Sequence, residues 1–290
     1  MSVQNARERA ISELAEALKV SRAGLFVGSG ISSISGLPSW KMLLGELIDR
    51  LDGQPGLEPG IISDAKLLLE DKSKWLTLAQ LLKRELGQVY TDYITERFTD
   101  NKIKPNKVHE AFVELDWKVI VTTNYDRLIE RAFAKKFGDE GDIPVFTFSS
   151  APKIASNYRR GSKFILKAHG DAREAPESIV LTETDYRHLV HREIGYQTIL
   201  QAIFTTNSFL FIGFSLTDPD LHLLLSFLHS AFHGDTPIHY ALMPENERLN
   251  AEDKVYYDDF RIHIIPIKPT DREGDTLLFL SDLKNALATK

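Results

Sequence analysis

Residues 23–41 read AGLFVGSGISSISGLPSWK, and the fold is decided in this stretch. Residues 23–27 form a short apolar run of the kind that is buried on both faces of a parallel sheet. Gly28-Ser29-Gly30 ends the run, and a polar loop follows. This arrangement suits a pyrophosphate, because glycines let phosphate oxygens approach the backbone and free N–H groups face the charge. Ser33 stands where the dinucleotide fingerprint has its third glycine, so a tight turn at positive φ is the alternative interpretation.

Strand and helix patterns alternate along the rest of the chain. Further apolar runs suited to buried strands are 117–122, 163–167, 209–213, 238–243 and 261–267. Helical periodicity marks 39–51, with Ser39 as its cap, and also 127–137, 183–206, 219–232, 245–260 and 275–287. The alternation predicts an α/β fold, a Rossmann-like, mostly parallel, six-stranded sheet with helices on both faces.

The interval between residues 52 and 108 has no good strand pattern. Its leucine-rich stretches, 65–69, 76–86 and 90–98, have helical character, and Gly and Pro residues punctuate its start. We therefore predict a single domain over residues 1–290. Within it, a helical insertion at 53–107 forms a smaller subdomain with part of 171–206.

Composition narrows the class of protein. Of the 290 residues 43% are hydrophobic and 26% charged, as in ordinary globular proteins, and the net charge of −6 leaves no basic face for nucleic acid. The absence of cysteine excludes disulfides, cysteine nucleophiles and Cys-based zinc modules. The N-terminal residues carry charges at helical spacing, unlike a signal peptide, and no apolar run reaches membrane-spanning length. We expect a cytoplasmic protein without a membrane partner.

Small polar residues cluster after the predicted strands. The clusters are Gly28-Ser29-Gly30, Thr122-Thr123-Asn124-Tyr125-Asp126, Ala168-His169-Gly170-Asp171 and Gly213-Phe214-Ser215-Leu216-Thr217-Asp218. Open parallel sheets bind ligands beyond the carboxyl ends of their strands, near the point where the strand order reverses. Because these clusters would meet there, the sequence predicts one ligand site at that edge.

Asn124 and His169 are the candidate catalytic residues. As structure alone, Asn124 would be a turn residue and Asp126 the cap of the helix that follows it. A histidine after a buried strand is often a satisfied core group. Here Gly170 is expected to open space beside the ring, which favours an imidazole that titrates near neutral pH.

The order and position of these motifs resemble the sirtuin family. Gly28-Ser29-Gly30-Ile31-Ser32, followed by Ser35-Gly36-Leu37-Pro38, is similar to the family's Gly-Ala-Gly-Ile-Ser…Ser-Gly-Ile-Pro loop. Thr123-Asn124-Tyr125-Asp126 is similar to its Gln-Asn-Ile-Asp, His169-Gly170 to its His-Gly, and Gly213-Phe214-Ser215-Leu216 to its Gly-Thr-Ser-Leu. The resemblance extends over roughly residues 20 to 270.

The resemblance implies a domain that binds NAD and cleaves the nicotinamide–ribose bond. Asn124 would contact the ribose and help position the water or acceptor, Asp126 would lie near the nicotinamide, and His169 would be the general base. The residues implied to bind NAD are Gly28, Ser29, Gly30, Ile31, Ser32, Thr123, Asp126, Gly213, Phe214, Ser215 and Asp218. Cationic nicotinamide is already a good leaving group, so the protein mainly supplies placement, a dipole and a base.

Departures from the family favour hydrolysis over acyl transfer. The four zinc-binding cysteines of deacetylating sirtuins are absent, and Ser39-Trp40-Lys41 replaces the family's Asp-Phe-Arg. The segment after His169 looks like that of zinc-free bacterial sirtuin-like effectors of antiviral defence. The implied function is an NAD glycohydrolase without zinc that releases nicotinamide and ADP-ribose during anti-phage defence.

Two other functions stay open. One is a protein deacylase or ADP-ribosyltransferase that uses the same pocket, and the other is a non-catalytic sensor of NAD or ADP-ribose. An NAD hydrolase would kill its host unless gated, and no linker to a second folded unit is evident after 261–267. We therefore expect a homo-oligomer with a partner that supplies the sensor. By resemblance that partner is a DNA-translocating ring ATPase or a short Argonaute protein.

His229 and His233 share one face of a predicted helix. No Glu follows His229 and no third ligand is evident nearby, so no metal site is predicted. A surface or subunit-contact face is the favoured interpretation.

Overall fold

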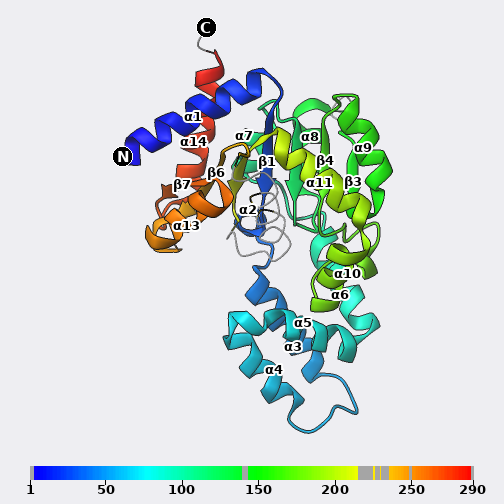
Figure 1. Cartoon of the computed structure of the whole chain (residues 1–290). Coiled ribbons are helices and arrows are strands. Elements are labelled where there is room, and N and C mark those ends of the chain that lie inside the picture. Colours follow the sequence, from blue (N-terminus) through cyan, green and yellow to red (C-terminus); the bar gives the residue numbers. More distant parts are fainter. Residues whose placement is uncertain are drawn as a thin grey trace.

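Seven parallel strands form one sheet in the part of the chain that the computed structural model describes, namely residues 3–138, 143–214, 225, 229, 235–247 and 250–288. The strands are β1 (Ala23–Val27), β2 (Val119–Thr122), β3 (Val145–Thr147), β4 (Phe164–Lys167), β5 (Ser208–Ile212), β6 (His239–Pro244) and β7 (Ile262–Ile267). Their order is β3-β4-β2-β1-β5-β6-β7 (Figure 1). The predicted fold class is confirmed. The strand that the sequence did not predict is β3, which is short and only partly buried at the edge of the sheet.

Helices cover both faces of this sheet and extend beyond its carboxyl edge. Those outside the insertion are α1 (Val3–Lys19), α2 (Ser29–Ile34), α7 (Lys107–Phe112), α8 (Leu128–Phe137), α9 (Ala151–Arg159), α10 (Glu183–Arg192), α11 (Ile194–Thr206), α13 (Asn250–Phe260) and α14 (Arg272–Ala288). Helix α3 (Trp40–Asp52) precedes the predicted insertion, which holds α4 (Ile61–Glu70), α5 (Trp75–Leu86) and α6 (Gln88–Thr99). Short 3₁₀ turns are η1 (Lys72–Lys74), η3 (Phe148–Ser150), η4 (Pro176–Ser178) and η5 (Glu245–Glu247).

The helices differ from the sequence prediction in two places. The expected polar loop after Gly28 is the helix α2, and the helix predicted over 183–206 is two helices, α10 and α11, because Glu193 leaves the helical region with ψ 54°. Ser39 caps α3 as predicted, its Oγ accepting from the Met42 N–H. The helix predicted at 219–232 lies outside the described residues except for Leu225 and His229.

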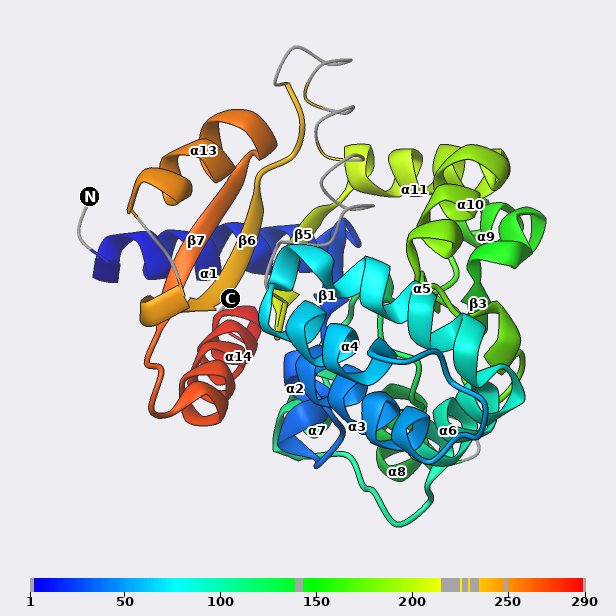
Figure 2. The ribbon, with the colours of Figure 1, turned by 90° about the horizontal axis from the view of Figure 1, so that it is seen from below.

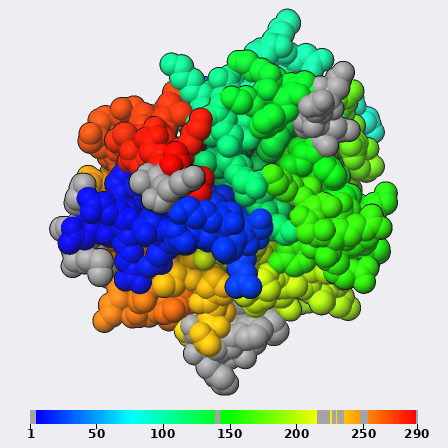
Figure 3. Space-filling model, turned by 90° about the horizontal axis from the view of Figure 1, so that it is seen from above, coloured from blue at the N-terminus to red at the C-terminus, as the bar shows by residue number. Residues whose placement is uncertain are grey.

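Alternate residues of the central strands enter two hydrophobic cores. Leu25 and Ile120 face α1, α7, α8 and α14, whereas Phe26 and Val121 face α9, α10 and α11. Figure 3 shows α1 at the surface of the molecule beside α14. Because helices cover both faces of the sheet, a ligand can reach it only at its edges or at the ends of its strands.

The helices α3 to α6 gather around a third hydrophobic cluster. They lie beyond the carboxyl edge of the sheet, on the same side as α2 (Figures 1 and 2). Ala172, Ile179 and Leu181, from the segment between β4 and α10, enter this cluster as well. The insertion therefore faces the strand ends at which the sequence predicts a ligand site.

Candidate active site

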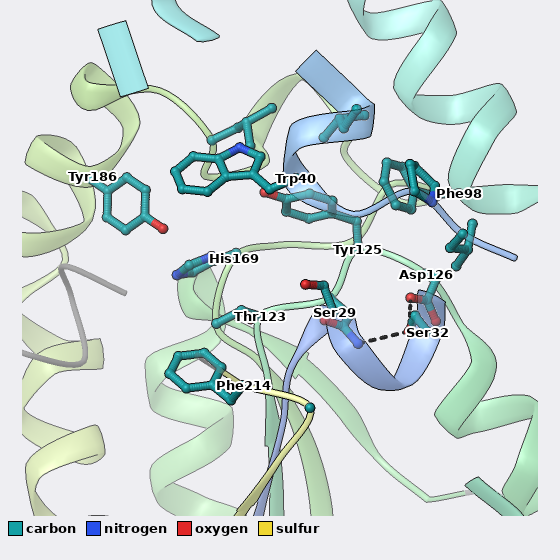
Figure 4. Close-up of a pocket in the computed structure, with 16 residues that line it drawn as sticks. Ser29, Ser32, Trp40, Phe98, Thr123, Tyr125, Asp126, His169, Tyr186 and Phe214 are labelled. Carbon is teal, nitrogen blue, oxygen red and sulfur yellow. Dashed lines mark hydrogen bonds between the residues drawn. The ribbon is translucent and has the colours of Figure 1, made fainter. Parts of the chain in front are cut away.

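A pocket of about 130 Å³ lies between the carboxyl ends of the central strands and the insertion (Figure 4). One water needs only ~15 Å³ measured this way, so the pocket has room for part of an organic ligand. Its lining residues are Ser29, Ser32, Leu37, Pro38, Trp40, Leu43, Phe98, Thr123, Asn124, Tyr125, Asp126, His169, Leu181, Tyr186, Gly213 and Phe214. Each polar cluster that follows a strand in the sequence contributes to this wall.

The structure brings most of the predicted site residues together. Ser29, Ser32, Thr123, Asn124, Asp126, His169, Gly213 and Phe214 line the pocket, while Gly28, Gly30 and Ile31 do not. Ser215 and Asp218 lie outside the described residues.

Sequence reasoning missed the apolar side of the pocket, including Trp40, Phe98, Leu181 and Tyr186. Trp40 meets Trp75 of α5 edge to face, with ring centroids 5.4 Å apart at 82°. These side chains come from α3, from α6 of the insertion and from the chain between β4 and the end of α10, which meet at the pocket only through tertiary packing. The nearest signal was Trp40, which lies two residues after the proline of the Gly-Leu-Pro motif.

The glycines after β1 allow two strand ends to touch. The Gly28 N–H donates to Ile212 O, and the Gly30 N–H donates to Gly213 O, both at 2.9 Å. A Cβ on Gly28 would lie 2.3 Å from Gly213 O. Gly28 has φ −99°, so the expected need for positive φ is wrong here, and close approach is the constraint. Both of these amides donate to protein carbonyls in this conformation, so neither is free to face a phosphate.

A chain of hydrogen bonds fixes the side chain of Asn124. Its Nδ2 donates to Ser32 Oγ at 2.9 Å and to Gly28 O at 3.2 Å, while Ser32 Oγ donates to Asp126 Oδ2 at 2.8 Å. Because the Ser32 proton points to a carboxylate, its lone pairs are left for the amide nitrogen, which sets the amide orientation. Asn124 Oδ1 is buried and has no hydrogen-bond partner within the described residues. The carbonyl oxygen is therefore the group of Asn124 that can serve a ligand.

Asp126 both stabilises the start of α8 and belongs to the pocket wall. Its Oδ1 accepts at 2.8 Å from the N–H of Leu128, the first residue of α8, although the N-cap position itself is Arg127, and its Oδ2 accepts from Ser32 Oγ. Asp126 is only 5% exposed. Its carboxylate acts on the pocket mainly through Ser32 and Asn124.

His169 lies where β4 ends, and two neighbouring segments hold its backbone. Its carbonyl accepts from the Val180 N–H at 2.9 Å, and the preceding Ala168 N–H donates to Thr122 O at 2.8 Å. The imidazole packs perpendicular to the Tyr186 ring, with centroids 5.2 Å apart at 83°. Gly170 does not open space beside the ring as expected. It has φ +91°, and a Cβ there would lie 3.3 Å from Ile179 Cα, so a tight turn requires the glycine.

A buried ammonium lies beneath the loops that carry Asn124 and His169. Lys167 Nζ donates to Asp171 Oδ2 at 2.8 Å and to Glu130 Oε1 at 3.3 Å, and it also bonds the Tyr125 and Asp126 carbonyls. Burial opposes the charge, but the two carboxylates outweigh it and raise the pKa of Lys167 above its usual value. The ion pairs therefore tie the loop after β2 to the loop after β4.

Within the described ranges, His, Cys, Asp and Glu side chains form no group of three or more that could hold a metal ion. Of the two histidines on the predicted helix face, His229 is described and His233 is not. No helix in the part of the chain covered by the structure is long and apolar enough to cross a bilayer.

The parallel sheet and the pocket at its carboxyl edge define a Rossmann-like α/β protein with a ligand site where the strand order reverses. The model of the SIR2-like domain family matches residues 118–265, just over half of the chain, and the chain belongs to this family.

Individual relatives share about a quarter of their aligned residues with this chain. Over 257 residues the chain is 25% identical to defense-associated sirtuin 2 of Bacillus subtilis, covering 88% of this chain and 24% of that protein. Over 303 residues it is 28% identical to the NAD(+) hydrolase ThsA of Cytobacillus dafuensis, covering 98% of this chain and 57% of that protein. A solved structure of a mutant Sir2 homologue with ADP-ribose gives a TM-score of 0.49 at 16% identity, covering 98% of each chain. The chain thus spans from a quarter to just over half the length of these two curated relatives.

Proposed function

We propose that this chain is an NAD glycohydrolase that cleaves NAD to nicotinamide and ADP-ribose in bacterial anti-phage defence. The observation that carries the proposal is the pairing, in one pocket, of the Asn124 carbonyl oxygen with the His169 imidazole. The relatives named as an NAD(+) hydrolase and as a defence-associated sirtuin support it.

Because nicotinamide is a good leaving group, the reaction mainly requires that NAD and the attacking water be held in the right positions. The bond between ribose C1′ and the nicotinamide nitrogen breaks, its electron pair leaves with neutral nicotinamide, and positive charge develops on the ribose. The Asn124 carbonyl dipole would stabilise this charge or accept a hydrogen bond from the attacking water. Neutral His169 would take the proton that the water loses as its oxygen bonds to C1′. The products are nicotinamide, ADP-ribose and one proton.

The remaining site residues fall into two proposed groups. Ser29, Ser32, Thr123, Gly213 and Phe214 would contact NAD, with Ser215 and Asp218 completing the set, whereas Gly28, Gly30 and Ile31 would shape the backbone behind them. Trp40, Phe98 and Leu181 would give the nicotinamide ring an apolar surface and keep bulk water away. No step in this scheme uses zinc.

We also propose the organisation of the whole chain. It would form one domain, and the smaller subdomain predicted over 53–107 and part of 171–206 would include α3, whose leucines enter the same hydrophobic cluster. The protein would be cytoplasmic, would assemble with copies of itself, and would answer to a partner such as a ring ATPase or a short Argonaute.

Incubation with NAD, followed by chromatographic separation of the products, tests the activity. We expect nicotinamide and ADP-ribose in equal amounts. His169→Ala should lower turnover by about 10²- to 10⁴-fold. Asn124→Ala should lose turnover while calorimetry still detects ADP-ribose binding, because the adenosine half is held elsewhere.

A matched control is His188→Ala, whose side chain is 48% exposed on α10. It should behave as the parent. Modified protein in place of free ADP-ribose would support a transferase, and NAD binding without any turnover under activating conditions would support a sensor. Either result would overturn the proposed hydrolase.

A further inference from the structure

Tyr186 shares the pocket with His169 and lies outside every motif of the sequence. It belongs to α10, is 9% exposed, and faces the imidazole across the pocket (Figure 4). The torsion that turns a histidine ring about its Cβ–Cγ bond has broad minima. A perpendicular aromatic ring with its centroid 5.2 Å from the imidazole centroid restricts that rotation.

The helix that carries Tyr186 is fixed to the insertion at its first turn. Asp185 forms a capping box with Thr182, and its carboxylate accepts from Lys83 Nζ of α5 at 2.9 and 3.1 Å. The Thr184 N–H also donates to Gln80 Oε1 at 3.3 Å. The Lys83 ammonium in turn lies 6.0 Å from the centroid of the Tyr90 ring. Helix α5 therefore sets where α10 begins.

The short segment before α10 connects the same two parts. Ile179 and Leu181 enter the hydrophobic cluster of the insertion, while Val180 between them enters the core beside the sheet. The Val180 N–H donates to the His169 carbonyl at 2.9 Å, and the Val180 carbonyl accepts from Tyr125 Oη at 2.8 Å. The backbone of His169 and the ring that packs against its side chain thus belong to one connected unit with the insertion.

We infer that Tyr186 is a positioning residue for His169, and that the Lys83–Asp185 ion pair holds Tyr186 in place from the insertion. The role in turnover rests on the proposed function. A general base acts only within hydrogen-bond reach of its proton, and a misplacement of about 1 Å can cost about 10²-fold in rate. The role depends on the contact between the two rings, which a phenylalanine at this position would keep.

Steady-state kinetics on the full chain test the inference. Tyr186→Phe should retain kcat within about twofold, whereas Tyr186→Ala should lower kcat by about 10- to 100-fold, with a smaller change in KM. Lys83→Met should lower kcat by about two- to fivefold, since it loosens α10 without reaching the pocket. ADP-ribose affinity should stay within about twofold in each variant.

Two matched controls share these helices. Arg187 follows Tyr186 and pairs with Glu183 on the solvent face, where their side chains are 64% and 60% exposed. Arg84 follows Lys83, with a side chain that is 82% exposed. Arg187→Ala and Arg84→Met should keep parental kcat. Equal effects of Arg84→Met and Lys83→Met would overturn the role of the ion pair.

A second readout does not depend on activity. The Tyr186 ring shifts the NMR signals of the His169 imidazole, which are assigned among the nine histidines by loss in His169→Ala. Tyr186→Ala and Lys83→Met should move these signals, and Arg84→Met should not. Unmoved signals together with parental kcat in Tyr186→Ala would overturn the positioning role. If the parent protein fails to hydrolyse NAD, the proposed function is wrong. The NMR shifts still show, independently of activity, whether the Tyr186 ring positions the His169 imidazole.

Discussion

The buried ammonium of Lys167, beneath the pocket, is expected to contribute strongly to the stability of the fold. Its side chain is 0% exposed and that of Asp171 is 1% exposed, so neither charge is solvated by water. Removing one member of a buried pair leaves the other uncompensated, which costs more than the pair itself contributes.

We therefore expect Lys167→Met to lower the free energy of unfolding by about 3–5 kcal/mol. The double variant Lys167→Met, Asp171→Asn should recover part of this loss, because Asp171 then carries no unpaired charge and Glu130 keeps its ion pair with Arg127 at 3.4 Å. Lys135→Met, which breaks an exposed pair with Glu110, should change stability by about 0.5 kcal/mol or less. Urea unfolding measures all three, and equal losses for Lys167 and Lys135 would contradict the argument.

His239 makes stability depend on pH. It is buried among Phe204, Phe209 and Phe211, and its Nδ1 accepts from the Phe209 N–H at 3.1 Å. Burial, with a smaller contribution from Arg261, lowers the pKa of His239 from 6.5 to about 3. Between these values the unfolded chain binds a proton that the folded chain does not. The stability is therefore complete above pH 6.5 and is lost as the pH falls.

Between pH 7 and pH 5 this group should account for a loss of about 2 kcal/mol. His239→Asn keeps an acceptor for the Phe209 N–H but cannot titrate, so its unfolding free energy should fall less over the same interval. Burial also lowers the pKa of His109, to about 4, and that residue should contribute a similar loss in both proteins. Identical pH slopes for parent and variant in urea titrations would refute the role of His239.

At this scale the sequence predicted Asn124 and His169 because each follows a buried strand within a recognisable motif. It could not predict Lys167 or Tyr186. Lys167 is read locally as an ordinary strand end, and only the fold shows that two carboxylates surround it. Tyr186 lies on a helix whose position depends on an insertion about 100 residues earlier, at Lys83.

Among the elements, the contact between the ends of β1 and β5 depends on glycine. A Cβ on Gly28 would meet Gly213 O at 2.3 Å, whereas one on Gly45, inside α3, would meet only Leu69 Cδ2 at 3.8 Å. Gly28→Ala should therefore destabilise the protein and weaken ADP-ribose binding. Gly45→Ala should stabilise it by up to about 1 kcal/mol through helix propensity. Thermal unfolding with and without ADP-ribose checks the pair, and a neutral Gly28→Ala would be contrary to this account.

The elements that were predicted wrongly share a cause. Helix α2 consists of Ser, Gly and Ile, which favour helix weakly, so its sequence resembles a loop. Backbone bonds to β5 and the burial of Ile31 stabilise it instead. Strand β3 has only Val145–Thr147 and lies at the sheet edge, too short for an apolar run to stand out. Tertiary contacts decide both cases, and local patterns do not contain them.

For the molecule as a whole, the proposed defence role demands low activity until a trigger arrives. We predict that the chain forms a homo-oligomer and hydrolyses NAD slowly by itself, with a partner raising turnover. Light scattering combined with the NAD assay tests both statements. A monomer of 32.8 kDa that hydrolyses NAD rapidly without a partner would contradict them.

The contact between Trp40 and Trp75 has an optical consequence. The chain has three tryptophans, and Trp40 lines the pocket while Trp117 is buried in the core on the α1 side of the sheet. A ligand that stacks on Trp40 should quench its emission and disturb energy exchange with Trp75. Trp40→Phe should abolish the change on adding ADP-ribose, and Trp117→Phe should keep it. We therefore expect Trp40 to act as a native fluorophore that reports, without any label, when the pocket fills.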